Sequence, residues 1–375
     1  MILQQLARQS LRELAESEGF ACLGFVAASE AKDFPHLKAW LDHGYAGGMD
    51  YLANRIEAYR HPEGVLPGCK SLMILALPYS SHPRTTPAKF PIHSDPPLLP
   101  ARVESGRGTI AAYAAGAIDY HECTHRALDR LTSKLDSMFP NCKSRGVVDT
   151  APLLERHFAH RAGLGWVGKN TMLLNRQLGS YFFLASVLTQ ADLIAGNDAI
   201  PGDQLLSGSI PETDHCGKCR ACLDACPTKA FVEPRILDAT RCISYWTIEH
   251  RGPVPIEIRE QIGDWLFGCD VCQAVCPWNR KRSGEVIPSL RIDDWEEKTD
   301  CMFWLQLSSE QFRIRFRKTA FWRTRLEGMQ RNAMIVAANT HCVDAIDLLE
   351  KFLLHDDPTL RDTAQWALGQ LRLEQ

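Results

Sequence analysis

Four cysteines of this chain follow the spacing Cys216-x2-Cys219-x2-Cys222-x3-Cys226-Pro227. Tight Cys-x2 turns place three thiolates around one iron-sulfur cube, while the fourth cysteine reaches a neighbouring cluster. A second run, Cys269-x2-Cys272-x3-Cys276-Pro277, repeats the end of this pattern. Structural zinc sites also use Cys-x2-Cys turns, but three cysteines at this spacing before x3-Cys-Pro are typical of clusters. The sequence therefore predicts two [4Fe-4S] clusters and one-electron transfer.

The second cysteine run lacks one ligand, because Leu266 stands where its first cysteine would be. Cys242 lies between the two runs and is the first candidate, Cys301 is the second, and a site with three cysteine ligands is the third possibility. The crossover of ligands in two-cluster ferredoxins assigns one cluster to Cys216, Cys219, Cys222 and Cys276. It assigns the other cluster to Cys226, Cys242, Cys269 and Cys272.

Asp149 follows an apolar strand pattern and precedes Thr150, Ala151 and Pro152. In α/β proteins the carboxyl edge of the sheet is where functional side chains gather. A half-buried carboxyl group there would have a raised pKa and could act as a general acid near neutral pH. The alternative is a helix N-cap before Pro152, and from the residues alone the cap is favoured.

A glycine turn, Gly163-x-Gly165-x-x-Gly168, has the letters of a dinucleotide-binding fingerprint. It follows a predicted helix where the fingerprint needs a strand, so we expect an ordinary turn. Lys169 and Asn170 at its end could hold a polar or anionic ligand, although a solvated lysine and a turn asparagine are equally compatible with the sequence.

A partial cobalamin signature occurs at Asp119-Tyr-His121, which begins like the Asp-x-His-x-x-Gly motif of proteins that ligate cobalamin through histidine. Thr124 stands where the glycine belongs, so the signature fails. We therefore interpret His121 as a structural histidine rather than a metal ligand.

The segment 311–331 is basic in an otherwise acidic protein, with seven cationic residues against Glu327. Its aromatic residues are Phe312, Phe316, Phe321 and Trp322, and its cationic residues are Arg313, Arg315, Arg317, Lys318, Arg323, Arg325 and Arg331. This composition suits a surface that tracks phosphates and stacks bases, and an amphipathic helix with a solvated cationic face is the alternative. The short helical pattern beside it favours a nucleic-acid contact, with RNA before duplex DNA.

The whole chain has 375 residues, a net charge of -3, 45% hydrophobic residues and a mean hydropathy of -0.20. It has the length of two or three domains and the balance of a soluble globular protein. Its longest apolar run is far too short for a membrane span, and the charged N-terminus predicts no secretory signal. Because a cytoplasmic protein meets a reducing environment, its fourteen cysteines are expected to bind metal rather than form disulfides.

Hydrophobic periodicity predicts an α/β domain in the first part of the chain, with helices near residues 3–14, 37–41, 119–138 and 153–162 and strands over 20–27, 71–77, 144–149 and 181–188. Six prolines between His82 and Pro100 predict an irregular surface loop. The tail predicts paired helices over 333–339, 344–354 and from Pro358, with Asp357 as cap, like a short HEAT-type repeat. We therefore expect a mixed α+β/α/β chain with three domains: 1–205 (α/β), 206–285 (bacterial ferredoxin-like, two clusters) and 286–375 (basic segment and α-helical HEAT-like repeat).

Several motifs together resemble the epoxyqueuosine reductase family. They are Gly47-Gly-Met-Asp-Tyr-Leu52, Val148-Asp-Thr-Ala-Pro152, Arg161-Ala-Gly-Leu-Gly-Trp-Val-Gly-Lys-Asn170, the two cysteine runs, Cys242-Ile-Ser-Tyr-Trp-Thr-Ile-Glu249 and the helical tail. The resemblance covers nearly the whole chain in the family's order. It implies an enzyme that uses iron-sulfur clusters and cobalamin to convert epoxyqueuosine to queuosine at the wobble position of tRNA.

The resemblance also implies roles for particular residues. It makes Asp149 the proton donor, places Lys169 and Asn170 at a cobalamin bound without a histidine ligand, and adds Arg60 as a weaker cofactor contact. Cys242 as the eighth ligand is likewise a family feature. The expected partners are the tRNA anticodon loop and an external low-potential electron donor, and the expected state is a cytoplasmic monomer.

Two other functions remain open for this sequence. A corrinoid reductive dehalogenase uses the same combination of cobalamin and two clusters, but it usually carries an export signal and acts on small organohalides. A plain ferredoxin-type electron carrier would need no cobalt.

Overall fold

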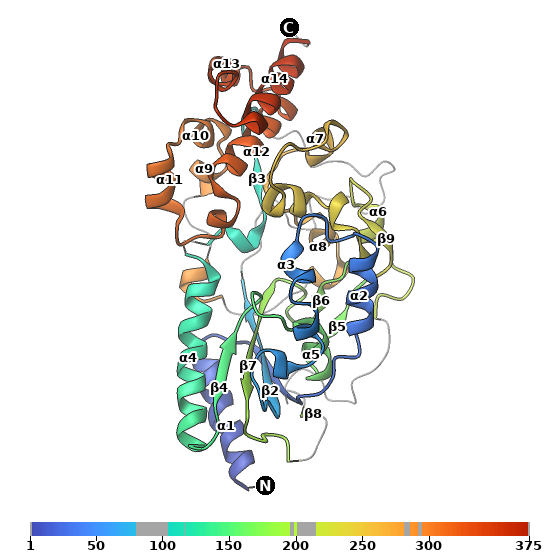
Figure 1. The fold of residues 1–375 in the computed structure, drawn as a ribbon, viewed down its shortest axis with the longest axis vertical. Coiled ribbons are helices and arrows are strands. Elements are labelled where there is room, and N and C mark those ends of the chain that lie inside the picture. Colours follow the sequence, from blue (N-terminus) through green and yellow to red (C-terminus); the bar gives the residue numbers. More distant parts are fainter. Residues whose placement is uncertain are drawn as a thin grey trace.

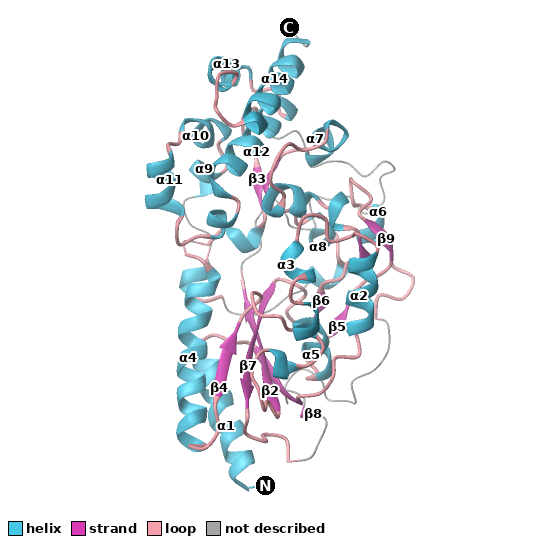
Figure 2. Ribbon diagram, in the orientation of Figure 1, coloured by secondary structure: helices cyan, strands magenta, loops and turns pink. Residues whose placement is uncertain are grey.

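The structure is a computed structural model that describes residues 2–79, 104–116, 118–195, 199–200, 215–280, 286–291 and 295–373. The proline-rich loop expected over 82–100 lies outside the described residues. Figures 1 and 2 show an elongated molecule, with the sheet of the N-terminal module at one end and the C-terminal helices at the other. The cysteine-rich segment lies between them (Figure 1). No helix of the described part of the chain is long and apolar enough to cross a membrane.

A five-stranded sheet organises the N-terminal module, in the order β4-β7-β2-β1-β8. Its strands are β1 (Cys22–Ala27), β2 (Ser71–Pro78), β4 (Ser144–Val147), β7 (Phe182–Thr189) and β8 (Ala199–Ile200). All four pairings are antiparallel. The predicted strands and the mixed helix-and-strand character of this module are confirmed. Because neighbouring strands run antiparallel, they need no βαβ crossover connections.

The two faces of the sheet are covered by different helices. Along β2 every residue is buried, and alternate side chains point to opposite faces. One set, including Met73 and Leu75, packs with α1 (Ile2–Ser17) and α4 (Tyr120–Met138). The other set, including Leu72 and Ile74, packs with α5 (Glu155–Arg161). A strand covered on both faces reads as a continuous apolar run, which is why β2 was predictable.

The glycine turn after α5 leads into a small hairpin of β5 (Trp166–Val167) and β6 (Leu173–Leu174). A Cβ atom at Gly165 would lie 2.0 Å from the carbonyl oxygen of Leu174, so only glycine allows this close approach. The element before the turn is a helix, as predicted, and the dinucleotide-binding interpretation is excluded.

The cysteine-rich module is built from short elements around its two cysteine runs. They are α6 (Ala221–Asp224), β9 (Phe231–Glu233), β10 (Ile236–Leu237), a π-helix (Tyr245–Glu249), α7 (Ile256–Ile262), β11 (Trp265–Phe267) and α8 (Val271–Ala274). β11 pairs in parallel with β3 (Thr109–Ile110), which belongs to the N-terminal part of the chain. From the N-terminal side, α2 (Phe34–Asp42) and α3 (Asp50–Ala53) also lie beside this module (Figure 1).

The C-terminal part is helical, with α9 (Trp295–Lys298), α10 (Cys301–Gln306), α11 (Ser309–Phe316), α12 (Arg325–Asn339), α13 (Ile346–Phe352) and α14 (Pro358–Leu373). Ser308 and Gln311 form a capping box at the start of α11. Asp357 accepts the Thr359 backbone N–H at 2.7 Å, so the predicted cap of the last helix is confirmed.

Three of the four aromatic residues predicted to interleave with the basic segment are core residues. Phe312, Phe316 and Phe321 are buried in one hydrophobic cluster with the helices of the tail. Trp322 is 43% exposed and stacks on Phe312, so it is the one of the four with a face open to solvent. The prediction of an aromatic stacking surface is therefore wrong for the three phenylalanines.

Candidate active site and cluster-binding module

The first cluster set lies around one cavity. Its volume is about 260 Å³, and it is lined by Lys169, Asn170, Leu174, His215, Cys216, Cys219, Cys222, Cys276, Pro277 and Trp278. Cys276 comes from the second cysteine run, so the fold brings it across to the three cysteines of the first run. The thiol of Cys222 has its pKa raised to about 12 by burial and by the neighbouring charges of Cys276, Cys216 and Cys219.

The other four cysteines also lie near one another. Burial raises the pKa of the Cys272 thiol, and the charges of Cys242 and Cys226 raise it further. The pKa of the Cys269 thiol is also raised, by burial first and then by the charges of Cys242 and Cys272. Cys301 lies elsewhere, in the helical core beside Cys342. The structure therefore gathers Cys242, and not Cys301, with the three cysteines of its predicted set.

The donor set of both groups fits iron-sulfur clusters. Within the described residues, no group of three or more histidine, cysteine or acidic side chains is arranged to hold a single metal ion. A [4Fe-4S] cube binds each thiolate through a different iron, so its ligands stand farther apart than those of one ion. Beside Cys216 and Cys276 packs Trp166, whose buried indole N–H has no acceptor among the described residues. Such a donor suits a cluster sulfur.

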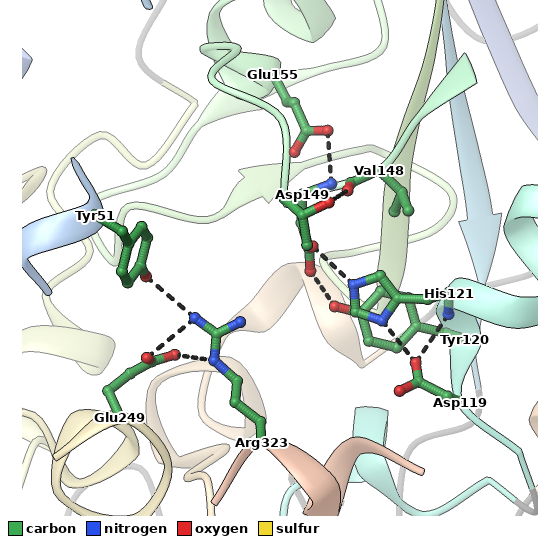
Figure 3. Close-up of polar contacts among 10 residues, drawn as sticks. Tyr51, Asp119, Tyr120, His121, Val148, Asp149, Glu155, Glu249 and Arg323 are labelled. Atoms are coloured by element: carbon green, nitrogen blue, oxygen red, sulfur yellow. Dashed lines mark hydrogen bonds and ion pairs between the residues drawn. The ribbon is translucent and has the colours of Figure 1, made fainter. Parts of the chain in front are cut away.

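Asp149 lies at the centre of a polar group at the end of β4 (Figure 3). Its carboxylate accepts a hydrogen bond from the Tyr120 hydroxyl and bonds His121 Nε2 at 2.8 Å. His121 Nδ1 lies 2.6 Å from Asp119 Oδ1, at the start of α4. The Asp149 side chain is 42% exposed and therefore open to a bound molecule.

His121 carries one of the protons of this polar group. Burial opposes its charge, but hydrogen bonds to Asp119 and Asp149 outweigh burial and raise its pKa to about 9. Burial likewise opposes ionisation of Asp149, yet His121, Tyr120 and Arg323 together lower the pKa of that carboxyl below its ordinary value. The expectation of a raised pKa at Asp149 is therefore wrong: at neutral pH it is a carboxylate that faces an imidazolium.

The backbone at Asp149 is unusual, with a φ of 30°. Residues with a β-carbon seldom adopt positive φ, so this loop is held in place by its contacts. The Asp149 N–H donates to Glu155 Oε1 at 3.0 Å. Burial and the charge of Asp149 raise the pKa of Glu155 to about 8, so a second proton is stored beside the first.

Arg323 lies across from Asp149 and joins three parts of the chain (Figure 3). Its Nε lies 2.6 Å from Glu249, which ends the π-helix of the cluster module. It also contacts the hydroxyl of Tyr51 from α3, at 3.3 Å. Burial would lower the pKa of Arg323, but Glu249 outweighs burial and raises it, so the cation is permanent.

The remaining predicted cofactor contacts are held by other partners. Lys169 Nζ donates to the carbonyls of Gly217 and Cys219. Asn170 is buried and donates to the carbonyl of Cys272. Arg60 forms ion pairs with Glu30 and Glu57 and covers the ring of Phe34. Of the four residues predicted to bind cofactor, Asp149 is thus the one that lies in the polar group of Figure 3.

The arrangement at His121 is compatible with a cobalamin that takes no histidine ligand. Both ring nitrogens of His121 are engaged by carboxylates, so neither lone pair is directed at a metal. The exposed Asp149 carboxylate remains available to a molecule bound beside it. The residues around Asp149 therefore fit a bound cobalamin, whereas the side chains of Lys169, Asn170 and Arg60 are engaged by other groups of the protein.

The seven predicted nucleic-acid contacts do not share one environment. Arg313, Arg317, Lys318 and Arg325 are exposed, and three of the seven have acidic partners: Arg315 is paired with Glu297, Lys318 with Glu122 and Arg323 with Glu249. Arg331 is 2% exposed and donates to the carbonyls of Trp246, His250 and Gly252. Burial lowers its pKa to about 10, which still leaves it charged at neutral pH. The prediction that Arg331 contacts nucleic acid is wrong.

Sequence reasoning missed several members of the polar group. His121 was interpreted as structural, and Tyr120, Glu155, Tyr51 and Glu249 were given no role. The three residues Asp119-Tyr120-His121 were visible as a polar run at a predicted helix start, but nothing local indicated that they would meet Asp149. Tyr51 and Glu249 stand inside the motifs Gly47–Leu52 and Cys242–Glu249, which was the available signal.

Family models match two parts of this chain. Residues 215–279 match a 4Fe-4S double cluster binding domain, and residues 60–150 match a domain described as epoxyqueuosine reductase QueG, DUF1730. A curated Pseudomonas aeruginosa epoxyqueuosine reductase is 33% identical over 96% of this chain and 93% of its own length. The Escherichia coli epoxyqueuosine reductase is 38% identical over 74% of this chain and 66% of its own length.

Solved structures are similar over nearly the whole chain. A crystal structure of epoxyqueuosine reductase with an epoxyqueuosine-modified tRNA-Tyr stem loop matches with a TM-score of 0.81 and 32% identity, covering 98% of this chain and 91% of that one. A structure of the Bacillus subtilis epoxyqueuosine reductase, with an aspartate-bearing catalytic loop swung out of the active site, matches with a TM-score of 0.80 and 32% identity over the same shares.

Proposed function

This chain belongs to the epoxyqueuosine reductase family, and from that premise we propose that it reduces epoxyqueuosine to queuosine at the wobble position of tRNA, with Asp149 delivering the proton. The observation that carries the proposal is the polar group at Asp149, in which His121 contacts the Asp149 carboxylate. The chain also holds a cluster module with eight cysteines in two sets. We further propose a cytoplasmic monomer and a HEAT-like pairing of α13 with α14.

Conversion of an epoxide to an alkene with loss of its oxygen as water consumes two electrons and two protons. The cysteines Cys216, Cys219, Cys222 and Cys276 would hold one cluster, and Cys226, Cys242, Cys269 and Cys272 the other, as the path from an external low-potential donor. Cobalamin, when bound, supplies a cobalt centre that takes up these electrons and acts on the epoxide ring. Asp149 is the residue we propose to meet that cofactor.

The chain's own residues supply the protons. His121 is protonated at neutral pH and shares a hydrogen bond with Asp149, so a proton can pass along the 2.8 Å contact to the carboxylate. Asp149 then gives it to the departing epoxide oxygen as a general acid. The Tyr120 hydroxyl fixes the other carboxylate oxygen, and the neutral Glu155 holds the loop through the Asp149 backbone.

The test of this function uses the anaerobically purified protein with tRNA that carries epoxyqueuosine, cobalamin and a strong reductant. Mass spectrometry of the tRNA nucleosides is expected to show queuosine only when cobalamin is present. Persistence of the epoxide while cobalt and iron are both bound would reject the substrate. Conversion to queuosine without cobalamin would reject the cofactor.

Activity is expected to fall as the pH rises above about 9, because His121 has a raised pKa and its proton is lost only as the pH passes that value. Asp119→Asn removes one of the two carboxylates that hold this pKa high, and asparagine can still cap α4. We expect the alkaline fall in the single-turnover rate to move to lower pH in Asp119→Asn.

Glu155→Gln is the matched control for this pH dependence. It removes a carboxyl group whose pKa is about 8, while the oxygen of the glutamine amide can still accept the Asp149 N–H. The fall near pH 9 should remain in Glu155→Gln. An alkaline limb that stays in place in Asp119→Asn would show that the proton does not come from His121.

The exposed cations of the basic segment are proposed to hold the tRNA backbone, while the wobble base is splayed into the site. We expect Arg313→Glu, Arg317→Glu and Lys318→Glu combined to weaken tRNA binding in a salt-dependent manner. Each lost phosphate contact on a single strand should reduce the slope of log affinity against log salt by about 0.7. Fluorescence anisotropy at several salt concentrations measures this slope.

Lys134→Glu makes the same kind of charge reversal at a single site on α4, outside the basic segment, and serves as a control. It should leave the salt slope near that of the parent protein. An unchanged slope in the triple variant would remove the basic segment from the tRNA interface.

A further inference from the structure

We propose that Lys169 tunes the reduction potential of the cluster bound by Cys216, Cys219, Cys222 and Cys276, making that cluster easier to reduce. The inference rests on the ligand set proposed above and goes beyond it. Lys169 follows β5 of the N-terminal module, whereas the first cysteine run belongs to the cluster module. Its side chain therefore crosses from one part of the chain to the other.

The contacts of Lys169 concentrate on the first ligand loop. Its Nζ donates to the carbonyl of Gly217 at 2.6 Å and to the carbonyl of Cys219 at 2.9 Å. The same side chain lines the cavity that the four cysteines share. The ammonium group is thus fixed by two acceptors at the edge of the space where the cluster would sit.

A fixed cation at that place has a defined electrostatic effect. A [4Fe-4S] cube with four thiolates carries net negative charge, and reduction adds one more negative charge. A neighbouring cation stabilises the reduced form more than the oxidised form and so raises the potential. The wall of the cavity includes Leu174, Pro277 and Trp278, whose apolar surfaces screen this interaction poorly compared with water.

The first cluster is also the one that an external donor can reach. Cys219 is exposed, whereas the other seven cysteines of the two sets are partly or fully buried. A cation at this cluster favours the arrival of the electron at the surface. The second set receives no comparable contact from Lys169 among the hydrogen bonds described, so the two clusters should differ in potential.

The test is a redox titration of the full-length protein, followed by electron paramagnetic resonance, without cobalamin or tRNA. Lys169→Met removes the charge at similar length, and Lys169→Gln removes it while keeping an N–H that can donate to the loop. In both, we expect one cluster to shift to a more negative potential while the other stays in place. Lys169→Arg, which keeps the charge, should titrate close to the parent protein.

Lys218→Met is the matched control, because Lys218 is exposed within the same ligand loop and its charge is screened by water. It should shift neither cluster appreciably. Unchanged potentials in fully loaded Lys169→Met or Lys169→Gln would overturn the proposal. Failure of both neutral variants to bind iron would overturn it as well, in favour of a purely structural lysine.

Iron and sulfide content separates this proposal from the one on which it rests. Parent protein that binds only one cluster would reject the two ligand sets, whatever the behaviour of Lys169. Parent protein with both clusters, combined with an unshifted Lys169→Gln, would reject only the tuning role.

Discussion

Replacing Asp149 by asparagine is expected to abolish the conversion of epoxyqueuosine while both clusters remain bound. The amide has the shape of the carboxyl group and tolerates the positive φ of 30° at this position, so the loop should keep its conformation. It cannot carry a proton from His121 to the substrate. Loss of general acid catalysis costs about 10²–10⁴-fold in rate, which single-turnover mass spectrometry of nucleosides can measure.

Asp33→Asn is a matched control for this experiment. Asp33 also pairs with a histidine, His157, at 3.0 Å, and its carboxyl pKa is likewise lowered by that contact. It lies outside the polar group of Figure 3, so we expect normal turnover. Asp149→Asn that keeps a rate within a few fold of the parent protein would refute the acid role of Asp149.

Cys242→Ala is expected to remove one cluster and all activity. The iron content should fall from about eight to about four atoms per chain, because the other set does not include this cysteine. The electron path would then be interrupted, whereas the fold of the N-terminal module should persist. Iron and sulfide analysis and the nucleoside assay on the same sample measure both effects.

Cys301→Ala distinguishes the two candidates for the eighth ligand. Cys301 lies in the helical core beside Cys342, so its truncation should cost only about 1 kcal/mol in stability and leave iron content unchanged. Loss of iron in Cys301→Ala together with full iron in Cys242→Ala would reverse the assignment. Full iron in both would favour a site with three cysteine ligands.

Local elements were predictable where their signal is local. The apolar run of β2 and the periodic pattern of α4 depend on neighbouring residues, and both elements formed where the sequence placed them. The direction of the strands was not predictable, because β7 enters the sheet between β2 and β4 from much later in the chain. Pairing across such distances leaves no short-range pattern, so the alternation of helices and strands did not determine whether neighbouring strands run parallel or antiparallel.

The residues of the site also divide into those with a local sequence signal and those without one. The cysteine spacing encodes cluster geometry within a few residues, so the cluster module could be predicted. The protonation of Asp149 depends on His121 and Tyr120, which lie 28 and 29 residues away, and no rule of local sequence describes that meeting. The same holds for Arg331, whose positive charge suggested a surface although its partners are buried carbonyls of the cluster module.

Arg331 also has a thermodynamic consequence. If α12 separated from the π-helix, three hydrogen bonds from the Arg331 guanidinium to backbone carbonyls would break, and hydrogen bonds to charged groups contribute about 1.5–3 kcal/mol each. The hydrophobic cluster around α12 contains Ile110 from the N-terminal part and Phe267 from the cluster module as well. The helical tail therefore shares its core and its hydrogen bonds with the cluster module, and the two should unfold in one cooperative transition rather than in two separate ones.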